Sequence, residues 1–158
     1  MLKLGDEKLR FAEDQDLLNL ESKLDDGKGG GIWPRHDKMG KPLHPWDHYH
    51  QEAMNELARR LRSRKDTAEG LELGRLDPRS KDRLRPAAAC LALHFLFVDA
   101  DNSGDASGFS TRKADYYWVR GGAIVDSEAN SLDYDADNSG AVDDIEKNQP
   151  FPTRFIRG

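Results

Sequence analysis

Oxygen-bearing side chains alternate in a six-residue sequence, Asp-Ala-Asp-Asn-Ser-Gly, which occurs at 99–104 and again at 135–140. The two copies begin 36 residues apart (135 − 99). Alternate acidic and hydroxyl side chains can turn toward one point, and a glycine in the sixth position allows the sharp turn that follows them. The pattern therefore predicts that a tight loop binds a hard cation such as Ca²⁺.

The second copy continues through twelve positions to a second carboxylate group. Glu146 stands at the twelfth position, where a carboxylate can bind an ion with both oxygens, and Ala141 at the seventh would offer its carbonyl. An ordinary turn rich in Asp, Asn, Ser and Gly is the alternative, but such a turn has no need of Glu146. The predicted ligands are Asp135, Asp137, Ser139, Ala141, Asp143 and Glu146.

The residues that follow the first copy are less suited to binding a cation. Its twelfth position is Ser110, which has one neutral oxygen, and its eighth is Ala106, where a bulky apolar residue is usual. Asp115 could reach the ion if the loop is longer than twelve residues. We expect a weaker site here, with a relic that binds nothing as the alternative. Its ligands would be Asp99, Asp101, Ser103, Asp105, Ser107 and Ser110.

Residues 87–149 resemble the EF-hand family of calcium-binding proteins, on the strength of these two loops and their separation. The resemblance implies one or two bound Ca²⁺ ions and two loops that pack face to face, joined by a short two-residue β contact. It also implies an exiting helix over 110–120, a break at Gly121-Gly122 and an entering helix over 123–134.

Hydrophobic patterning predicts an all-α fold, a compact helical domain that includes this pair. A helix is expected from Asp6 to Leu24, and a second from Pro45 or Asp47 to about Lys65. A third should start at Asp77-Pro78, with Pro86 kinking or restarting it. Residues 87–98 are apolar on nearly every face and predict a central core helix. We divide the chain into 1–86, packing on the calcium pair, and 87–158, the pair with its tail.

The charge is unevenly distributed along the 158 residues. The chain carries a net charge of −5, and residues 87–158 hold 12 acidic and 6 basic residues, a net of −6. The acidity therefore lies with the loops, where a cation would neutralise it and couple binding to folding. The arginines over 59–64 favour a solvated helix end, and no aromatic residue is interleaved with them, so no nucleic-acid partner is predicted.

The sequence gives limited information about the cellular compartment of the protein. The single cysteine excludes an internal disulfide, and the first residues lack the apolar segment of a signal peptide. The longest apolar run, 87–98, is about 18 Å as a helix and does not span a bilayer core of about 30 Å. These features predict neither a membrane span nor a signal sequence, and favour a cytoplasmic or non-classically exported protein.

A second group of chemistry-bearing residues lies in the Trp- and His-rich segment 33–52. On a helix, His44, His48 and Glu52 would share a face that could hold Zn²⁺ or another transition metal. Polar surface histidines are the interpretation we favour. Cys90 and His94, also four residues apart, could form a nucleophilic pair, but a buried thiol is usually inert.

Two functions follow from these patterns. The favoured one is a calcium-binding protein in which Ca²⁺ stabilises a helical domain and supports interaction with an unidentified protein partner. A structural or buffering role is favoured over a large-opening sensor, because the EF-hand part lacks methionine and Pro150 and Pro152 cut its last helix short. The alternative is a small, exported hydrolase or metal-dependent enzyme using segment 33–52, with calcium as a structural ion.

Overall fold

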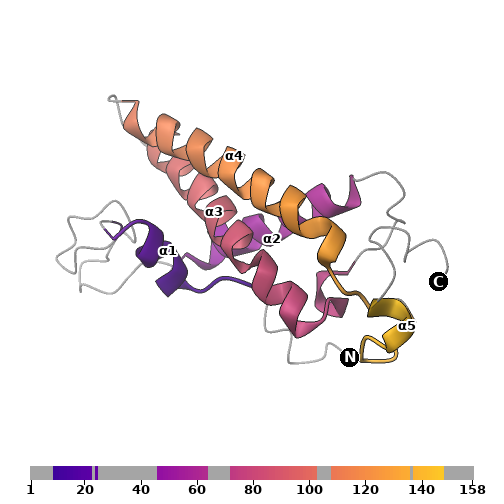
Figure 1. Ribbon diagram of the computed structural model, residues 1–158. Coiled ribbons are helices and arrows are strands. Elements are labelled where there is room, and N and C mark those ends of the chain that lie inside the picture. Colours follow the sequence, from indigo (N-terminus) through magenta and orange to yellow (C-terminus); the bar gives the residue numbers. More distant parts are fainter. Residues whose placement is uncertain are drawn as a thin grey trace, which may run out of the picture.

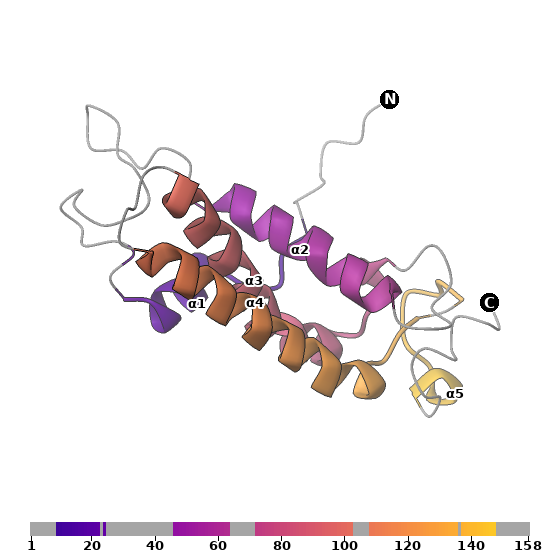
Figure 2. The ribbon, with the colours of Figure 1, turned by 90° about the horizontal axis from the view of Figure 1, so that it is seen from above.

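A computed structural model describes residues 9–22, 24, 46–63, 72–102, 108–135 and 137–147. Two long helices, α3 (Pro78–Asn102) and α4 (Phe109–Glu128), run side by side in opposite directions (Figure 1). Helix α2 (Asp47–Arg62) packs against α3, and the short α1 (Asp14–Leu20) lies across the same helix (Figure 2). The described residues form no strand, which confirms the all-α prediction.

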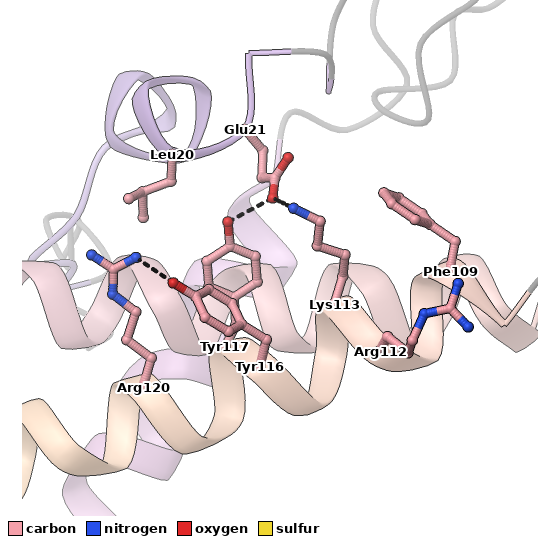
Figure 3. A pocket seen from close by; sticks show the side chains of 8 residues that line it. All are labelled: Leu20, Glu21, Phe109, Arg112, Lys113, Tyr116, Tyr117 and Arg120. Carbon is pink, nitrogen blue, oxygen red and sulfur yellow. Dashed lines mark hydrogen bonds and ion pairs between the residues drawn. The ribbon is translucent and has the colours of Figure 1, made fainter.

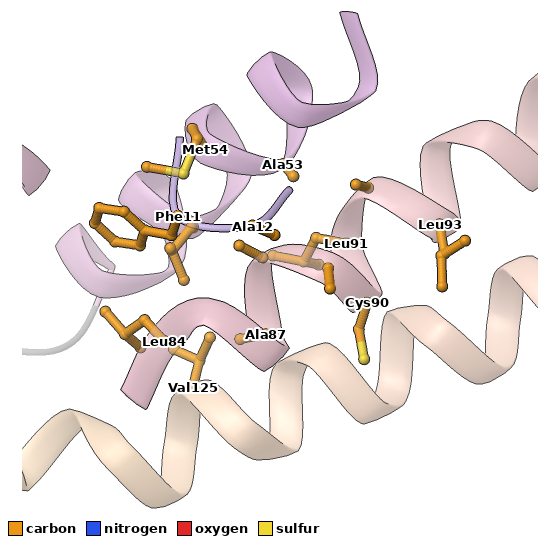
Figure 4. Close-up of a cluster of buried hydrophobic side chains, with 14 of the residues drawn as sticks. Phe11, Ala12, Ala53, Met54, Leu84, Ala87, Cys90, Leu91, Leu93 and Val125 are labelled. Carbon is orange, nitrogen blue, oxygen red and sulfur yellow. The ribbon is translucent and has the colours of Figure 1, made fainter. Parts of the chain in front are cut away.

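Helix α3 is the central core helix, as predicted. Asp77 accepts a hydrogen bond at 2.8 Å from the backbone N–H of Ser80, so it satisfies a donor of the first turn just before Pro78. The helix continues through Pro86 without restarting. Nearly all of 87–97 is buried, because α1, α2 and α4 all pack on this helix (Figure 4).

Helix α4 corrects the predicted break. It runs without interruption through Gly121 and Gly122, because these glycines allow close packing and are not helix ends. A Cβ at Gly121 would lie 3.2 Å from Leu91 Cδ2 on α3. A Cβ at Gly122 would lie 2.3 Å from the guanidinium of Arg60, which rests 4.1 Å from the Trp118 ring centroid. The entering helix predicted over 123–134 ends at Glu128, followed by a 3₁₀ turn, Ala129–Ser131.

Helix α2 begins at Asp47, one of the two predicted starts, and buries one apolar face. Tyr49, Ala53, Leu57 and Leu61 are all buried, as is Trp46 just before the helix. The solvated end predicted for its arginines holds only in part. Arg59 is 63% exposed, but Arg60 is 15% exposed and hydrogen-bonds with Glu56 at 2.7 Å. Arg64 lies outside the described residues.

Helix α1 is shorter than predicted. Residues 9–13 are not helical, and the helix begins at Asp14, where Glu13 N–H donates to the Asp16 carboxylate at 2.7 Å. Leu17 in the helix and Leu24 beyond it are fully buried, and Leu20 is half-buried against the core. Residues 1–8 lie outside the described residues.

The boundary drawn between residues 86 and 87 falls inside α3, so the two halves of the chain share their central helix. None of the helices that the structure describes is both long enough and apolar enough to cross a membrane. The last described element is α5 (Asp144–Lys147), a single turn at the end of the second hexapeptide loop.

Candidate metal site

The second hexapeptide is anchored to the start of α3 by a short antiparallel pairing of backbone. Leu76 and Tyr134 form an isolated bridge. On one side of it, Asp77 N–H donates to the Asp133 carbonyl at 3.0 Å, and on the other, Asp135 N–H donates to the Arg75 carbonyl at 3.0 Å. Arg75 Nε also donates to the Asp135 carbonyl at 2.8 Å. The first residue of the loop is therefore fixed on both of its backbone groups.

Side-chain hydrogen bonds from Asp135 then shape the loop. Its carboxylate accepts from the backbone N–H of Ser139 at 2.9 Å and from that of Gly140 at 2.8 Å. Two residues adopt left-handed backbone, Asn138 at φ 60° and Gly140 at φ 94°. Gly140 thus takes the conformation for which the pattern required a glycine, and asparagine is the next most tolerant residue for it.

Asp135 is only 5% exposed, yet it is held as an anion. Burial alone would raise the pKa of this carboxyl. The hydrogen bonds from the Gly140 and Ser139 amides favour the charged form more strongly, and they hold the pKa of Asp135 below its ordinary value. A charged oxygen is what a hard cation requires.

The Ser139 hydroxyl lies close to two other oxygens of the loop. Ser139 Oγ lies 2.9 Å from the Ala141 carbonyl, to which it donates, and 3.5 Å from Asp135 Oδ1. Oxygens that share one Ca²⁺ at about 2.4 Å are roughly 2.8–3.4 Å apart, so the distance to the Ala141 carbonyl is in this range and the distance to Asp135 is slightly longer. The donors present therefore suit calcium, provided that the Ser139 hydroxyl turns its proton away from Ala141.

The carboxylates described here do not by themselves complete a metal site. No three His, Cys, Asp or Glu side chains among the described residues form a group that could hold a metal ion. The predicted ligands also include the Ser139 hydroxyl and the Ala141 carbonyl, which a group of His, Cys, Asp and Glu side chains does not count. They include Glu146 as well, whose side chain lies outside the described residues. Asp137 and Asp143 are both exposed.

The first hexapeptide has a different backbone. Helix α3 continues through its first four residues, 99–102, and ends at Asn102. Asp99 is exposed and accepts a hydrogen bond at 3.0 Å from the Tyr49 hydroxyl of α2. Ser110 is buried in the first turn of α4. The side chain of Asp101 and residues Ser103, Asp105 and Ser107 lie outside the described residues.

The two copies lie at opposite ends of the helical hairpin. Asp135 is bonded to Arg75, just before α3, whereas Asp99 is in the last turn of that helix. Some 21 residues of helix separate these points, or about 30 Å at 1.5 Å per residue. The expected face-to-face packing is therefore not found between the described parts of the two loops. Ala106, through which the expected β contact would run, lies outside the described residues.

The other candidate clusters do not form reactive groups where they are described. His48 is exposed, and His44 lies outside the described residues. His94 donates from Nδ1 to the Ala114 carbonyl at 2.9 Å, so that nitrogen supports helix packing. Burial raises the pKa of the Cys90 thiol, which keeps it protonated and unreactive.

Sequence reasoning missed the anchor of the second loop. Arg75 and Leu76 hold Asp135 and Tyr134 from some 60 residues away in the chain. No local spacing signals such a pairing, although the apolar Leu76 beside the helix-start Asp77 marks an extended residue. Comparisons of the chain with protein-family models, with curated proteins and with solved structures find no significant match.

Proposed function

We propose that this chain is a calcium-binding protein in which one ion, held by the second hexapeptide loop, stabilises one end of the helical hairpin. The observation that carries the proposal is the position of Asp135, a nearly buried anion whose carboxylate accepts two backbone hydrogen bonds. Those bonds curl the loop so that a hydroxyl and a carbonyl lie within reach of the same point.

The ligands of this ion are the six that the sequence predicts. Asp135, Asp137 and Glu146 would supply charged oxygens, and Ala141 its carbonyl. Asp143 stands at the position that often acts through a water. The ion would then link the anchored segment 133–135 to α5, so that binding energy is transmitted to the packing of α3.

A stabilising role fits the surroundings of the loop better than a switching role. A sensor needs a long exiting helix that swings out and exposes an adaptable groove. Here α5 is described over four residues, and Pro150 and Pro152 follow it closely in the sequence. The entering side is pinned to α3 by backbone hydrogen bonds. Both features favour a fixed site.

The first hexapeptide is a poorer candidate for a second ion. Residues two apart on a helix do not face each other, so a copy whose first four residues are helical does not turn alternate side chains toward one point. An ion there would require α3 to end three residues earlier. We therefore propose one ion per chain.

Calorimetric titration of Ca²⁺ into metal-stripped protein, with Mg²⁺ and near-physiological salt present, tests the proposal. We expect one site per chain. Glu146→Gln should weaken it by at least about tenfold, because a bidentate charged ligand becomes a neutral one. Asp144→Asn is the matched control, since Asp144 is 95% exposed, pairs with Lys147 and is not a predicted ligand. An absence of binding, or an equal loss in both variants, would contradict the proposal.

A further inference from the structure

A pocket of about 500 Å³ lies between the end of α1 and the first three turns of α4 (Figure 3). It is at the opposite end of α4 from the proposed calcium loop. Its volume falls within the range of about 300–1,000 Å³ that is common for small-molecule sites. Leu20 and Glu21 of α1 form one wall, and α4 supplies the other with Phe109, Arg112, Lys113, Tyr116, Tyr117 and Arg120.

The pocket is cationic in a chain whose net charge is −5. Its one carboxylate, Glu21, is already engaged, because it accepts a hydrogen bond from the Tyr117 hydroxyl at 2.7 Å and pairs with Lys113. Arg112 and Arg120 form no ion pair with any carboxylate that the structure describes. Among the described residues, these two positive charges have no carboxylate partner.

Aromatic rings lie beside these charges. Tyr116 is 51% exposed and Phe109 is 42% exposed, both large fractions for apolar rings. Tyr116 is held in place, because its ring packs edge-on against Tyr117 at 5.0 Å and its hydroxyl accepts a hydrogen bond from Arg120 at 3.0 Å. A fixed, accessible ring beside a guanidinium can stack on a planar group while the guanidinium binds an anion.

The order of these residues along α4 gives the pocket its geometry. Arg112, Tyr116 and Arg120 are four residues apart and share one face of the helix, about 6 Å per step. The exposed ring thus lies between two guanidinium groups. A strand of nucleic acid would need a longer basic track than two charges. The volume and the short span favour a small ligand.

We propose that this pocket binds a small organic anion that carries an aromatic or heteroaromatic ring. The ring stacks against Tyr116 and Phe109, and a carboxylate or phosphate on it is bound by the guanidinium of Arg112 or Arg120. Both kinds of anionic group share the geometry that guanidinium recognises in a bidentate manner.

Calorimetry and tyrosine-ring NMR on the full chain test the proposal with two ring-bearing probes. Adenosine 5′-monophosphate carries a phosphate and 1-naphthoate a carboxylate. Adenosine and 1-naphthalenemethanol keep the rings without the charge, and inorganic phosphate and acetate keep the charge without a ring. We expect at least one ring-bearing anion to bind at least about tenfold tighter than its matched partial probes, with its shifts centred on Tyr116. The stronger of the two anions identifies the anionic group.

Substitutions locate the binding on α4. Arg120→Gln and Tyr116→Ala should each weaken the preferred probe by at least about fivefold. Both residues are exposed, so helix content by circular dichroism should stay unchanged. Two controls should bind normally: Val119→Ala, 69% exposed on the same helix but outside the pocket, and Arg79→Gln, an exposed arginine on α3.

Three results would overturn the proposal. Inorganic phosphate that binds as well as the ring-bearing anions would reduce the pocket to a counter-ion site. Binding unaffected by Arg120→Gln and Tyr116→Ala would place the ligand elsewhere. If neither ring-bearing probe binds at about 10 mM, the pocket is not a site for small anions. The same conclusion holds if a single-stranded oligonucleotide binds while both small probes fail.

Discussion

The same six-residue sequence adopts two different backbones at the positions that the structure describes in both copies. In the first copy, residues 99–102 complete α3, and Asn102 is helical. In the second, the equivalent Asn138 is left-handed at φ 60°, and the chain curls around the carboxylate of Asp135. The same six residues, with the same intrinsic backbone preferences, thus form the end of a helix in one place and a loop in the other. The structure that precedes each copy decides which of the two forms.

The segments that precede the two copies differ in how their backbone N–H and C=O groups are hydrogen-bonded. The first copy follows a buried helix, where each added residue gains a hydrogen bond at little further entropic cost. The second follows an extended segment, and both backbone groups of Asp135 are already bonded to Arg75. A helix cannot propagate through a residue whose N–H is used elsewhere. In this molecule the hexapeptide thus forms a loop where the incoming chain is held extended, and continues a helix where the incoming chain is helical.

The largest expected difference between the copies is in calcium affinity. Asp135→Asn removes a charged ligand together with the acceptor that shapes the loop, and it should weaken binding by at least about tenfold. Asp99→Asn is the matched change in the first copy and should alter affinity by less than about twofold. Calorimetric titration of both variants and the natural chain measures the difference directly.

Equal losses in the two variants would contradict the comparison. They would mean that both copies contribute to the same binding event, as in the face-to-face pair implied by the family resemblance. A loss confined to Asp99→Asn would place the ion at the first copy, and the loop geometry around Asp135 would then be structural only.

Helix α4 connects the two copies, and Gly121 is a point of close packing between α4 and α3. Gly121→Ala should lower the free energy of unfolding by up to about 2 kcal/mol. The new methyl group would lie 3.2 Å from Leu91 in a packed interface, and this overpacking outweighs the gain of about 1 kcal/mol in helix propensity. Chemical denaturation followed by circular dichroism measures this change.

Gly122→Ala is the matched control at the next position. Its methyl group would meet only the end of the flexible Arg60 side chain, which can move away. The gain of about 1 kcal/mol in helix propensity should offset the lost contact between Arg60 and Trp118. A large loss at both positions would show that α4 breaks at the glycine pair as the sequence first indicated.

Acid should weaken the molecule at the end that carries the first copy. His50 is buried on α2, next to Tyr49, and accepts or donates a hydrogen bond at 2.8 Å to Asp14. Burial lowers the pKa of His50 from its ordinary 6.5, so the unfolded chain binds the proton more readily. The free energy of unfolding should therefore fall as the pH drops below about 6.5.

Denaturation at a series of pH values, with His50→Gln and the exposed His48→Gln compared, checks this dependence. The slope around pH 6 should disappear in the first variant and persist in the second. The proposed calcium loop has no histidine between 129 and 147, so any calcium affinity should be unchanged between pH 7 and 6. A slope that survives in His50→Gln would assign the proton to another group.

The helices could be predicted where apolar residues recur on one face. The start of α2 at Asp47, the start of α3 after Asp77 and the burial of 87–98 all follow from short-range patterns. The helix break predicted at Gly121-Gly122 was wrong because a glycine pair is as typical of two closely packed helices as it is of a helix end. Only the presence of Leu91 and Arg60 opposite the pair distinguishes the two.

The candidate sites show the same limit of local reasoning. The alternation of oxygen-bearing side chains in the second loop is visible in the local sequence, whereas its anchor at Arg75 and Leu76 is not. The pocket between α1 and α4 is not evident from the sequence, although its Arg112, Tyr116 and Arg120 repeat with helical spacing. Their importance depends on Glu21 of α1 neutralising Lys113, a contact across 92 positions of the chain.

The smallest expected effect is that of replacing the asparagine of each copy with alanine, which should change the free energy of unfolding in opposite directions in the two copies. Asn102→Ala places a better helix former at the end of α3 and should raise the free energy of unfolding by a few tenths of a kcal/mol, up to about 0.7. Asn138→Ala forces a Cβ-bearing residue without a polar side chain into left-handed backbone, and it should lower stability by about 1 kcal/mol.

Amide hydrogen exchange at Ser139 and Gly140, read beside global denaturation, separates these local changes from the stability of the helical hairpin. Faster exchange in Asn138→Ala but not in Asn102→Ala is expected, because only the second copy needs the left-handed residue to keep both amides on Asp135. Asn138→Gly should restore protection, since glycine adopts φ 60° without steric cost. The same sign of effect in both alanine variants would show that the two copies share one backbone conformation, and the contrast between a helical and a looped hexapeptide would be wrong.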